Sequence, residues 1–181
     1  MTIKNLIDED FVNYKKPSMF IGMPKCSFKC DKECGELVCQ NSDLAAAPEI
    51  EIDDYEIWTR FVNNPISEAI VFGGLEPFDT FEDLGAFLLS LKGDGKNDDI
   101  DVVIYTGYYP EEIKYQLLTF VNMKGIIIKF GRYIPNKPSI YDPLLGVTLA
   151  SDNQYAVRIE DLPLNEWYEE FMEKIRKAGP V

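Results

Sequence analysis

The stretch Ser18–Asn41, SMFIGMPKCSFKCDKECGELVCQN, joins a short apolar run to every cysteine of the chain. Its first residues, SMFIGM, form an apolar run of the length that is typical of a buried strand. The four cysteines follow directly, at positions 26, 30, 34 and 39. We therefore predict a strand whose carboxyl end leads into a long loop, residues 26–41, which we call the cysteine loop.

Four thiols in so short a window, in a chain without histidine, indicate that thiolates hold a metal or a cluster. Three thiolates on a 4Fe–4S cluster leave one iron open to a small molecule, as a catalytic zinc keeps an open position. Four thiolates could instead close a structural zinc site, although zinc knuckles favour paired C-x2-C spacings, which this loop lacks. Disulfides are a third alternative, which a reducing cytosol disfavours.

Beyond the cysteine loop, strand and helix patterns alternate along the chain. Apolar runs predict strands at Ala69–Phe72, Asp101–Tyr105 and Gly125–Lys129. Helical spacing predicts helices at Asp53–Asn63, from an Asp79 and Thr80 cap to Leu91, from Pro110 in the first turn to Phe120, and at Asn165–Lys177. Short strands are predicted at Val147–Leu149 and Tyr155–Ile159, after an irregular Pro-rich segment. This alternation in 181 residues predicts a single α/β domain, residues 1–181, with a mostly parallel sheet.

The unusual residues fall directly after the predicted strands. The first strand is followed by the cysteines, and the next three by GGLEP at 73–77, TGY at 106–108 and FGR at 130–132. Ligands of such sheets bind beyond the carboxyl ends of the strands, so these loops form one candidate site. The pair Gly73-Gly74 lets a ligand approach the backbone, whose carbonyl groups can accept hydrogen bonds from an ammonium group. Glycine turns after strands are also common without a ligand.

The charge balance is strongly acidic, with 18 Lys and Arg against 31 Asp and Glu and a formal net charge of −13. A negative field of this size repels nucleic acid and anionic membranes, so we expect neither as a partner. The first residues, MTIKNLIDEDFVNYKK, lack the apolar core of a secretory signal. No run approaches the roughly 20 apolar residues of a spanning helix, so we expect a cytoplasmic protein.

These motifs resemble those of the radical S-adenosylmethionine superfamily. Its members carry a C-x3-C-x2-C motif after a first strand and a G-G-E/D-P turn after the second; here C-x3-C, a later cysteine and GGLEP stand in those places. Within the superfamily, IYTGY at 104–108, GRY at 131–133 and SDNQ at 151–154 resemble segments of the activating enzymes of anaerobic ribonucleotide reductase. The resemblance extends from about Ser18 to Ile159.

The resemblance implies an open, partial (β/α) barrel, a 4Fe–4S cluster and S-adenosylmethionine as cofactors. The activity it implies is cleavage of S-adenosylmethionine to a 5′-deoxyadenosyl radical, which makes a glycyl radical on a partner. That partner would be a glycyl-radical enzyme, the large subunit of anaerobic ribonucleotide reductase, and the electron donor would be flavodoxin-type or similar. The chemistry would belong to the cluster and the cofactor, so no side chain is predicted as catalytic.

The resemblance also implies roles for individual residues, with two departures. Cys34 comes one residue late for the family motif, whereas Val38-Cys39-Gln40-Asn41 matches the surroundings of the family's third cysteine; we therefore predict Cys26, Cys30 and Cys39 as cluster ligands and Cys34 as spare. Leu75 either replaces the second glycine of the turn or is inserted after an intact pair. The residues predicted to bind S-adenosylmethionine are Gly73, Gly74 and Glu76 at its ammonium group, and Thr106, Ser151 and Asn153 at its ribose or carboxylate side.

Two other functions remain open from the sequence. The protein could be a non-enzymatic cysteine–metal module, holding zinc or an iron–sulfur cluster as an adaptor or electron carrier. It could also be a radical S-adenosylmethionine enzyme that acts on a small molecule. The glycine turn and the ordered TG, GR and SDNQ segments favour the activating enzyme over the adaptor.

Overall fold

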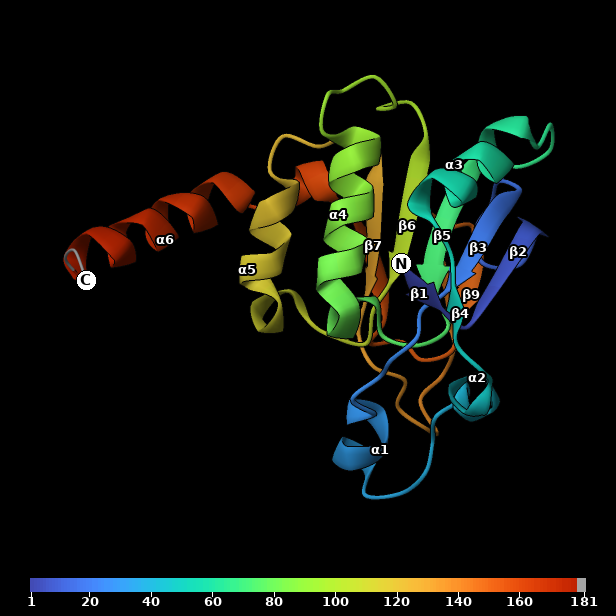
Figure 1. Cartoon of the computed structure of the whole chain (residues 1–181). Helices are drawn as coiled ribbons and strands as arrows, with labels where there is room; N and C mark the ends of the chain where they lie inside the picture. The colour runs from blue at the N-terminus through green and yellow to red at the C-terminus, as the bar shows by residue number, and fades with distance from the viewer. Residues whose placement is uncertain (179–181) are drawn as a thin grey trace.

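Six strands form the sheet on which the protein is built, in the order β10-β7-β6-β5-β3-β2 (Figure 1). The structure is a computed structural model that describes residues 1–178. The strands are β2 (Asn5–Asp10), β3 (Ser18–Gly22), β5 (Ala69–Gly73), β6 (Asp101–Tyr105), β7 (Ile126–Phe130) and β10 (Tyr155–Arg158). The four central strands are parallel, and β2 and β10 pair with them antiparallel at the edges. The predicted α/β class with a mostly parallel sheet is confirmed, and the described strands do not close into a barrel.

Continuous apolar runs explain why these segments are the central strands. Every residue of β3, β5 and β7 is buried. Parallel strands that are covered on both faces require such runs, since alternation with polar residues would bury unpaired polar groups. The predicted strands at 18–23, 69–72, 101–105 and 125–129 are therefore confirmed within one residue at each end.

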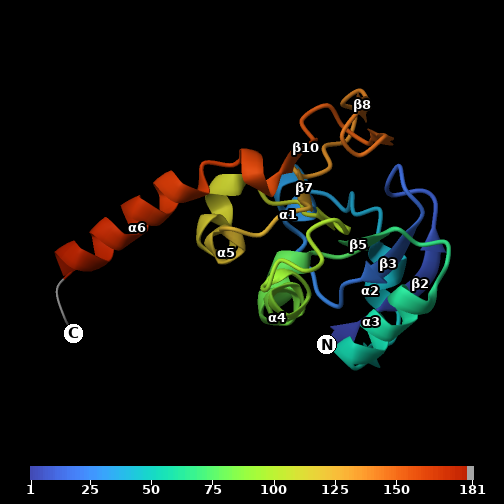
Figure 2. The same cartoon turned by 90° about the horizontal axis from the view of Figure 1, so that it is seen from above.

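The helices that join the parallel strands all cover one face of the sheet. They are α3 (Asp54–Asn63), α4 (Phe81–Lys92) and the short α5 (Lys114–Leu117). The strands lie side by side in chain order, so right-handed crossovers bring each helix to the same face (Figure 2). Phe72 and Phe87 meet edge to face in this layer, with ring centroids 5.5 Å apart. This layer is the larger of the two apolar cores.

The opposite face of the sheet has no helix layer in Figure 2 and carries a smaller core. A hairpin covers it, formed by β8 (Ile140–Asp142) and β9 (Val147–Leu149). Buried Leu145 and Leu149 from this region pack against Val71 and Val103 of the sheet. We call this face the inner face, and the candidate site lies at its end where the parallel strands have their carboxyl ends.

Other elements were missed or differ from the prediction. The cysteine region, predicted as a loop, contains α1 (Lys29–Cys34) and is followed by α2 (Ser42–Ala46), and a small sheet pairs β1 (Thr2–Ile3) with β4 (Ile50–Glu51). The continuous helix predicted from Pro110 to Phe120 is wrong, because the segment divides into η2 (Pro110–Glu112), α5 and η3 (Leu118–Phe120). Two 3-10 turns, η1 (Pro77–Thr80) and η4 (Ile159–Asp161), complete the elements before the last helix.

The predicted cap of α4 is also wrong. Thr80 occupies the N-cap position but makes no side-chain capping bond. Asp79 instead accepts hydrogen bonds from the backbone N–H of Ser27 and the hydroxyl of Tyr108, both at 2.5 Å. A tertiary contact with the cysteine loop has thus replaced a local one.

The last helix, α6 (Leu164–Ala178), confirms the predicted closing helix and extends away from the body of the molecule (Figure 1). Only its first turns pack on the core, through buried Leu164 and partly buried Trp167. Within residues 1–178, no helix combines the length and the apolar character needed to cross a membrane.

Candidate functional site

A cavity of about 460 Å³ lies at the carboxyl ends of the parallel strands, where α1 and α2 are seen in Figure 1. This volume falls within the roughly 300–1,000 Å³ of small-molecule sites. Three of the four cysteines line it, namely Cys26, Cys30 and Cys39, and Cys34 does not. The structure thus brings together the three cysteines that were predicted as ligands, although eight residues separate the second from the third.

The cysteine thiols are half-buried and unpaired by disulfides. The backbone N–H groups of Phe28 and Asn41 point at the sulfurs of Cys26 and Cys39, at 3.3 and 3.4 Å. Burial raises the pKa of Cys26 to about 11 against the bond from Phe28, and it raises the pKa of Cys30 as well. In the metal-free protein Cys26 and Cys30 are therefore thiols, and a metal must displace their protons.

The spacing of the potential ligands bears on what they can hold. Within residues 1–178, no three side chains of Cys, Asp or Glu are gathered closely enough to hold a single metal ion. A cluster of four irons and four sulfides is larger than one ion, so its thiolate ligands stand further apart around it. Cys26, Cys30 and Cys39 line one cavity, so they are the residues that could hold a cluster there.

The glycine turn, residues 73–77, approaches the cysteine region closely. Gly74 has a φ of +76°, and a Cβ there would lie 2.4 Å from Cδ2 of Leu44 in the α2 helix. Gly73 is less confined, since its Cβ would lie 3.3 Å from both Phe20 and Tyr105. The left-handed conformation falls on Gly74, and Leu75 follows it as a buried side chain that lines the cavity. The positive φ and the close approach of Leu44 both favour glycine at position 74.

The carbonyl groups of this turn differ in whether they accept a hydrogen bond within the protein. The carbonyl of Gly73 accepts the backbone N–H of Met23 at 2.9 Å, which extends the pairing of β3 with β5. Within residues 1–178, no hydrogen bond is donated to the carbonyl oxygens of Gly74 and Leu75. Both residues line the cavity.

Glu76 is only 7% exposed and connects the glycine turn to the turn after β6. Its carboxylate accepts hydrogen bonds from the hydroxyl of Thr106 at 2.6 Å and from the backbone N–H groups of Gly107 at 2.8 Å and Phe78 at 3.2 Å. Burial raises the pKa of Glu76 to about 7 in spite of these bonds. Glu76 and Thr106 both line the cavity, as predicted for them, but they also bind each other.

Lys129 places a buried ammonium group at the cavity, which the sequence did not reveal as a site residue. The side chain is 6% exposed and lies between Ile128 and Phe130, which face the helix layer, so alternation turns it to the inner face. Its Nζ donates to the carbonyl groups of Gly131 at 2.8 Å and Thr106 at 3.3 Å. Burial lowers its pKa to about 8. Within residues 1–178 it forms no ion pair, although a buried charge is costly without one.

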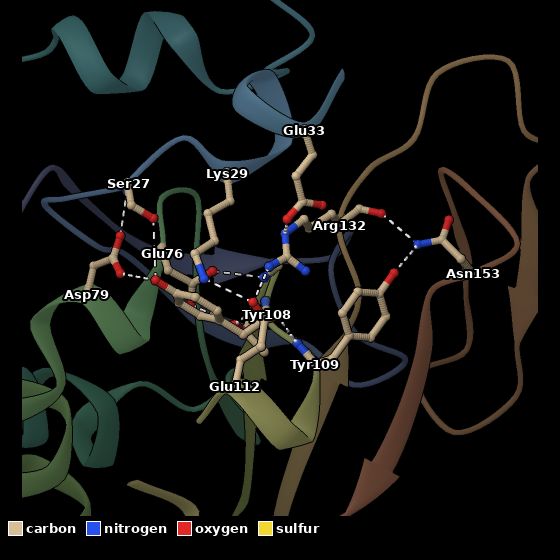
Figure 3. Close-up of polar contacts among 12 residues, drawn as sticks. Ser27, Lys29, Glu33, Glu76, Asp79, Tyr108, Tyr109, Glu112, Arg132 and Asn153 are labelled. Atoms are coloured by element: carbon tan, nitrogen blue, oxygen red, sulfur yellow. Dashed lines mark hydrogen bonds and ion pairs between the residues drawn. The ribbon is translucent and has the colours of Figure 1, made fainter. Parts of the chain in front are cut away.

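Two sets of polar contacts hold α1 against the rim of the site (Figure 3). In the first, Asp79 binds both Ser27 and Tyr108, as described above, and the hydroxyls of Ser27 and Tyr108 lie 3.3 Å apart. Lys29 adds a cation–π contact, with its Nζ 4.3 Å from the centroid of Tyr108. The start of the cysteine loop is thereby joined to the loops after β5 and β6.

Arg132 is the centre of the second set of contacts (Figure 3). It is 4% exposed, donates to the carboxylate of Glu112, and lies 3.1 Å from that of Glu33 in the α1 helix. Glu112 also accepts from Lys29 at 2.9 Å. Burial would raise the pKa of Glu112, but the bonds from Arg132, Tyr109 and Lys29 outweigh it and lower the pKa to about 2. Arg132 is therefore a buried arginine that pairs with two acids whose side chains reach the surface.

Ser151 and Asn153 do not line the cavity. Asn153 donates to the carbonyl of Arg132 at 2.8 Å and to the hydroxyl of Tyr109 at 3.1 Å, and Ser151 accepts from the backbone N–H of Ile134 at 3.3 Å. They hold the loop after β7 in place. Their neighbour Gln154 does line the cavity and donates to the carbonyl of Gly131 at 3.2 Å.

Several cavity residues were not identified from the sequence. Tyr105 and Lys129 are the last inward-facing residues of β6 and β7, and a polar residue that ends an apolar strand is a signal that could have found them. Tyr133 and Gln154 lie in irregular segments, where no periodicity reports the direction of a side chain. Polar residues near the carboxyl ends of apolar strands, such as Tyr105 and Lys129, therefore indicate the cavity.

Taken together, three cysteines, the glycine turn, a buried glutamate and a buried lysine line one cavity. Such a set can hold a metal cluster on one side and a zwitterionic small molecule on the other. Comparison of the chain with protein-family models, curated proteins and solved structures finds no match in any of the three.

Proposed function

We propose that the protein is a 4Fe–4S radical S-adenosylmethionine enzyme that generates a glycyl radical on a partner enzyme, the large subunit of anaerobic ribonucleotide reductase. The observation that carries the proposal is that Cys26, Cys30 and Cys39 line the same cavity as the glycine turn and Thr106. The order of the motifs along the chain, described above, supports the choice of partner. An open partial (β/α) barrel of the radical S-adenosylmethionine type is the fold that this proposal implies.

The donor set fits the cluster. Three half-buried thiols come from one loop, and N–H groups already point at two of the sulfurs. Hydrogen bonds of this kind favour the thiolate form that binds iron. Three protein ligands leave a fourth iron position for the amino and carboxylate groups of S-adenosylmethionine.

The other side of the cavity fits the amino acid part of that cofactor. The free carbonyl oxygens of Gly74 and Leu75 are acceptors for an ammonium group, and the buried ammonium group of Lys129 is a donor without an acidic partner among residues 1–178. A ligand that brings both charges would satisfy both at once. Glu76 would act by holding the glycine turn and the turn after β6 together, because its oxygens are already occupied.

When bound, the reduced cluster would supply the electron that cleaves S-adenosylmethionine to methionine and a 5′-deoxyadenosyl radical, which removes hydrogen from a glycine of the partner. The chain itself would bind, orient and exclude water. Within residues 1–178, only a hairpin and loops cover the inner face of the sheet, and an open sheet leaves a path for a loop of another protein. The electron would come from a flavodoxin-type or similar donor.

Anaerobic reconstitution tests the proposal. The protein is loaded with iron and sulfide, reduced and mixed with S-adenosylmethionine, and 5′-deoxyadenosine is measured by chromatography. We expect a brown protein that releases 5′-deoxyadenosine and bleaches in air. A colourless zinc protein would contradict the proposal, and a brown protein that never cleaves the cofactor would identify an electron carrier or adaptor instead.

The choice of ligands has its own test. Cys34→Ala is expected to keep iron, sulfide and cofactor cleavage, because Cys34 does not line the cavity, whereas Cys39→Ala is expected to lose all three. Both variants remove one thiol from the same loop, so each serves as the control for the other. Loss in Cys34→Ala with retention in Cys39→Ala would refute the ligand assignment.

A further inference from the structure

Cys39 lies far along the chain from Cys30, although both line the cavity. Cys34 follows Cys30 by one helical turn of α1, whereas Cys39 lies five residues further along the chain. Local geometry alone would favour Cys34 as a neighbour of Cys30, because residues four apart share a helix face. The cavity nevertheless contains Cys39 and not Cys34.

The chain reverses directly after α1. Gly35 takes a left-handed φ of +73° and donates its N–H to the carbonyl of Asp31 at 2.9 Å, which ends the helix. This bond turns the chain but does not specify where the following residues go. The remaining segment, from Glu36 to Val38, has no buried residue.

The side chain of Asp31 supplies the missing constraint. One oxygen, Oδ1, accepts hydrogen bonds from the backbone N–H groups of both Val38 and Cys39, each at 2.8 Å. Asp31 stands next to Cys30 in the chain, so these two bonds return the loop to Cys30 and bring Cys39 with it. The α1 helix that carries Asp31 is itself held by Lys29 and Glu33 through Glu112 and Arg132.

We infer that Asp31 is a positioning residue, which selects Cys39 over Cys34 as the third cluster ligand; this rests on the function proposed above. The residue does not itself bind the cluster. Its carboxylate holds the backbone of the loop in the one path that presents Cys39 to the cavity. Without it, Cys34 and Cys39 would compete for the same position.

The contact is tested first in the metal-free protein, by amide hydrogen exchange. Asp31→Ala is expected to speed exchange of the Val38 and Cys39 amides by about tenfold or more, since both lose their acceptor. Asp31→Asn keeps an oxygen and is expected to restore most of the protection. Glu36→Ala, an exposed acid of the same loop, is the control and is expected to change neither amide.

Cluster retention tests the selection. After reconstitution with iron and sulfide, loss of iron to a chelator is expected to be about tenfold faster in Asp31→Ala than in the parent protein, with rescue by Asp31→Asn. Adding Cys34→Ala is expected to reduce iron further in the Asp31→Ala background and to have no effect in the parent. Equal retention in Asp31→Ala and the parent, or no effect of Cys34→Ala in either background, would overturn the inference.

The two proposals fail in distinguishable ways. If the parent protein binds no iron, the proposed function fails, and hydrogen exchange still decides whether Asp31 holds Cys39. If the parent cleaves S-adenosylmethionine and Asp31→Ala does so with an equally stable cluster, the proposed function stands and the role of Asp31 is refuted.

Discussion

At the scale of the residue, Glu76 illustrates how a motif residue can serve the protein before it serves a ligand. Glu76, in the glycine turn, was predicted to bind a cofactor, and it lines the cavity. Its oxygens, however, are engaged by Thr106, Gly107 and Phe78. Its first task is to connect two turns that lie 30 residues apart in the chain.

The raised pKa of Glu76 predicts a pH dependence of stability. Ionisation costs more in the folded than in the unfolded protein, so the contribution of Glu76 to stability falls as pH rises from its ordinary pKa of 4.5 through about 7. Glu76→Gln cannot ionise. The free energy of unfolding of the variant minus that of the parent is therefore expected to increase by up to about 3 kcal/mol between pH 4.5 and pH 8.

Urea denaturation of the metal-free proteins across this range measures the difference. Glu36→Gln, which replaces an exposed carboxyl group of the cysteine loop, is the control and should follow the parent. A difference between Glu76→Gln and the parent that stays constant with pH would show that the pKa of Glu76 is the same in the folded and the unfolded protein, and would contradict the prediction.

At the scale of the element, α1 is a helix that contributes no buried side chain to the apolar core. None of its six residues is buried, and a helix this short is not stable by itself. Its contacts with the rest of the protein are polar and run through Lys29 and Glu33 to Glu112 and Arg132 (Figure 3). The position of the cysteine loop therefore depends on these charge pairs.

Arg132→Ala is expected to lower the free energy of unfolding by about 2 kcal/mol, the cost of losing a buried charged hydrogen bond. The substitution leaves Glu112 with Lys29 and the backbone N–H of Tyr109, and it removes the guanidinium from the ring of Tyr109, whose centroid lies 5.3 Å away. Denaturation at pH 7 measures the loss.

Lys137→Ala provides the matched control, because its pair with Asp152 is exposed on both sides and such pairs contribute about 0–1 kcal/mol. An effect of Arg132→Ala no greater than that of Lys137→Ala would contradict the structural role of Arg132.

At the scale of the whole molecule, the protein divides into a rigid sheet and a polar cap. The central strands are buried along their length and covered by apolar layers on both faces. The segment from Cys26 to Ala46 contributes no buried side chain and closes one end of the cavity. The two parts are therefore expected to differ in local stability.

Hydrogen exchange is expected to show this division. Amides of β5, β6 and β7 should exchange only through global unfolding, and those of residues 26–46 through faster local opening. Loading with the iron–sulfur cluster is expected to protect residues 26–46, since the cluster binds the folded loop and not the open one. Equal protection of sheet and loop by the cluster would contradict the division.

The sequence alone determined the order of strands and helices, and with it the edge of the sheet where the site lies. Apolar runs such as Ile126–Phe130 report burial directly, and the carboxyl ends of parallel strands meet at one edge whatever the packing details. The cysteines, the glycine turn and Thr106 were found for this reason. The predicted cap of α4 is wrong because Asp79 binds a distant segment, and the continuous helix predicted after Pro110 is wrong because the segment divides into shorter pieces.

Only the tertiary structure decided which side chains meet within that edge. The bonds of Asp31 to Cys39, the inward direction of Lys129 and the scaffolding contacts of Asn153 join residues whose proximity no local pattern encodes. In irregular segments, the direction of a side chain is set by the hydrogen bonds available in the folded protein and not by a repeat along the chain. For that physical reason, three of the four cysteines line the cavity and Cys34 does not.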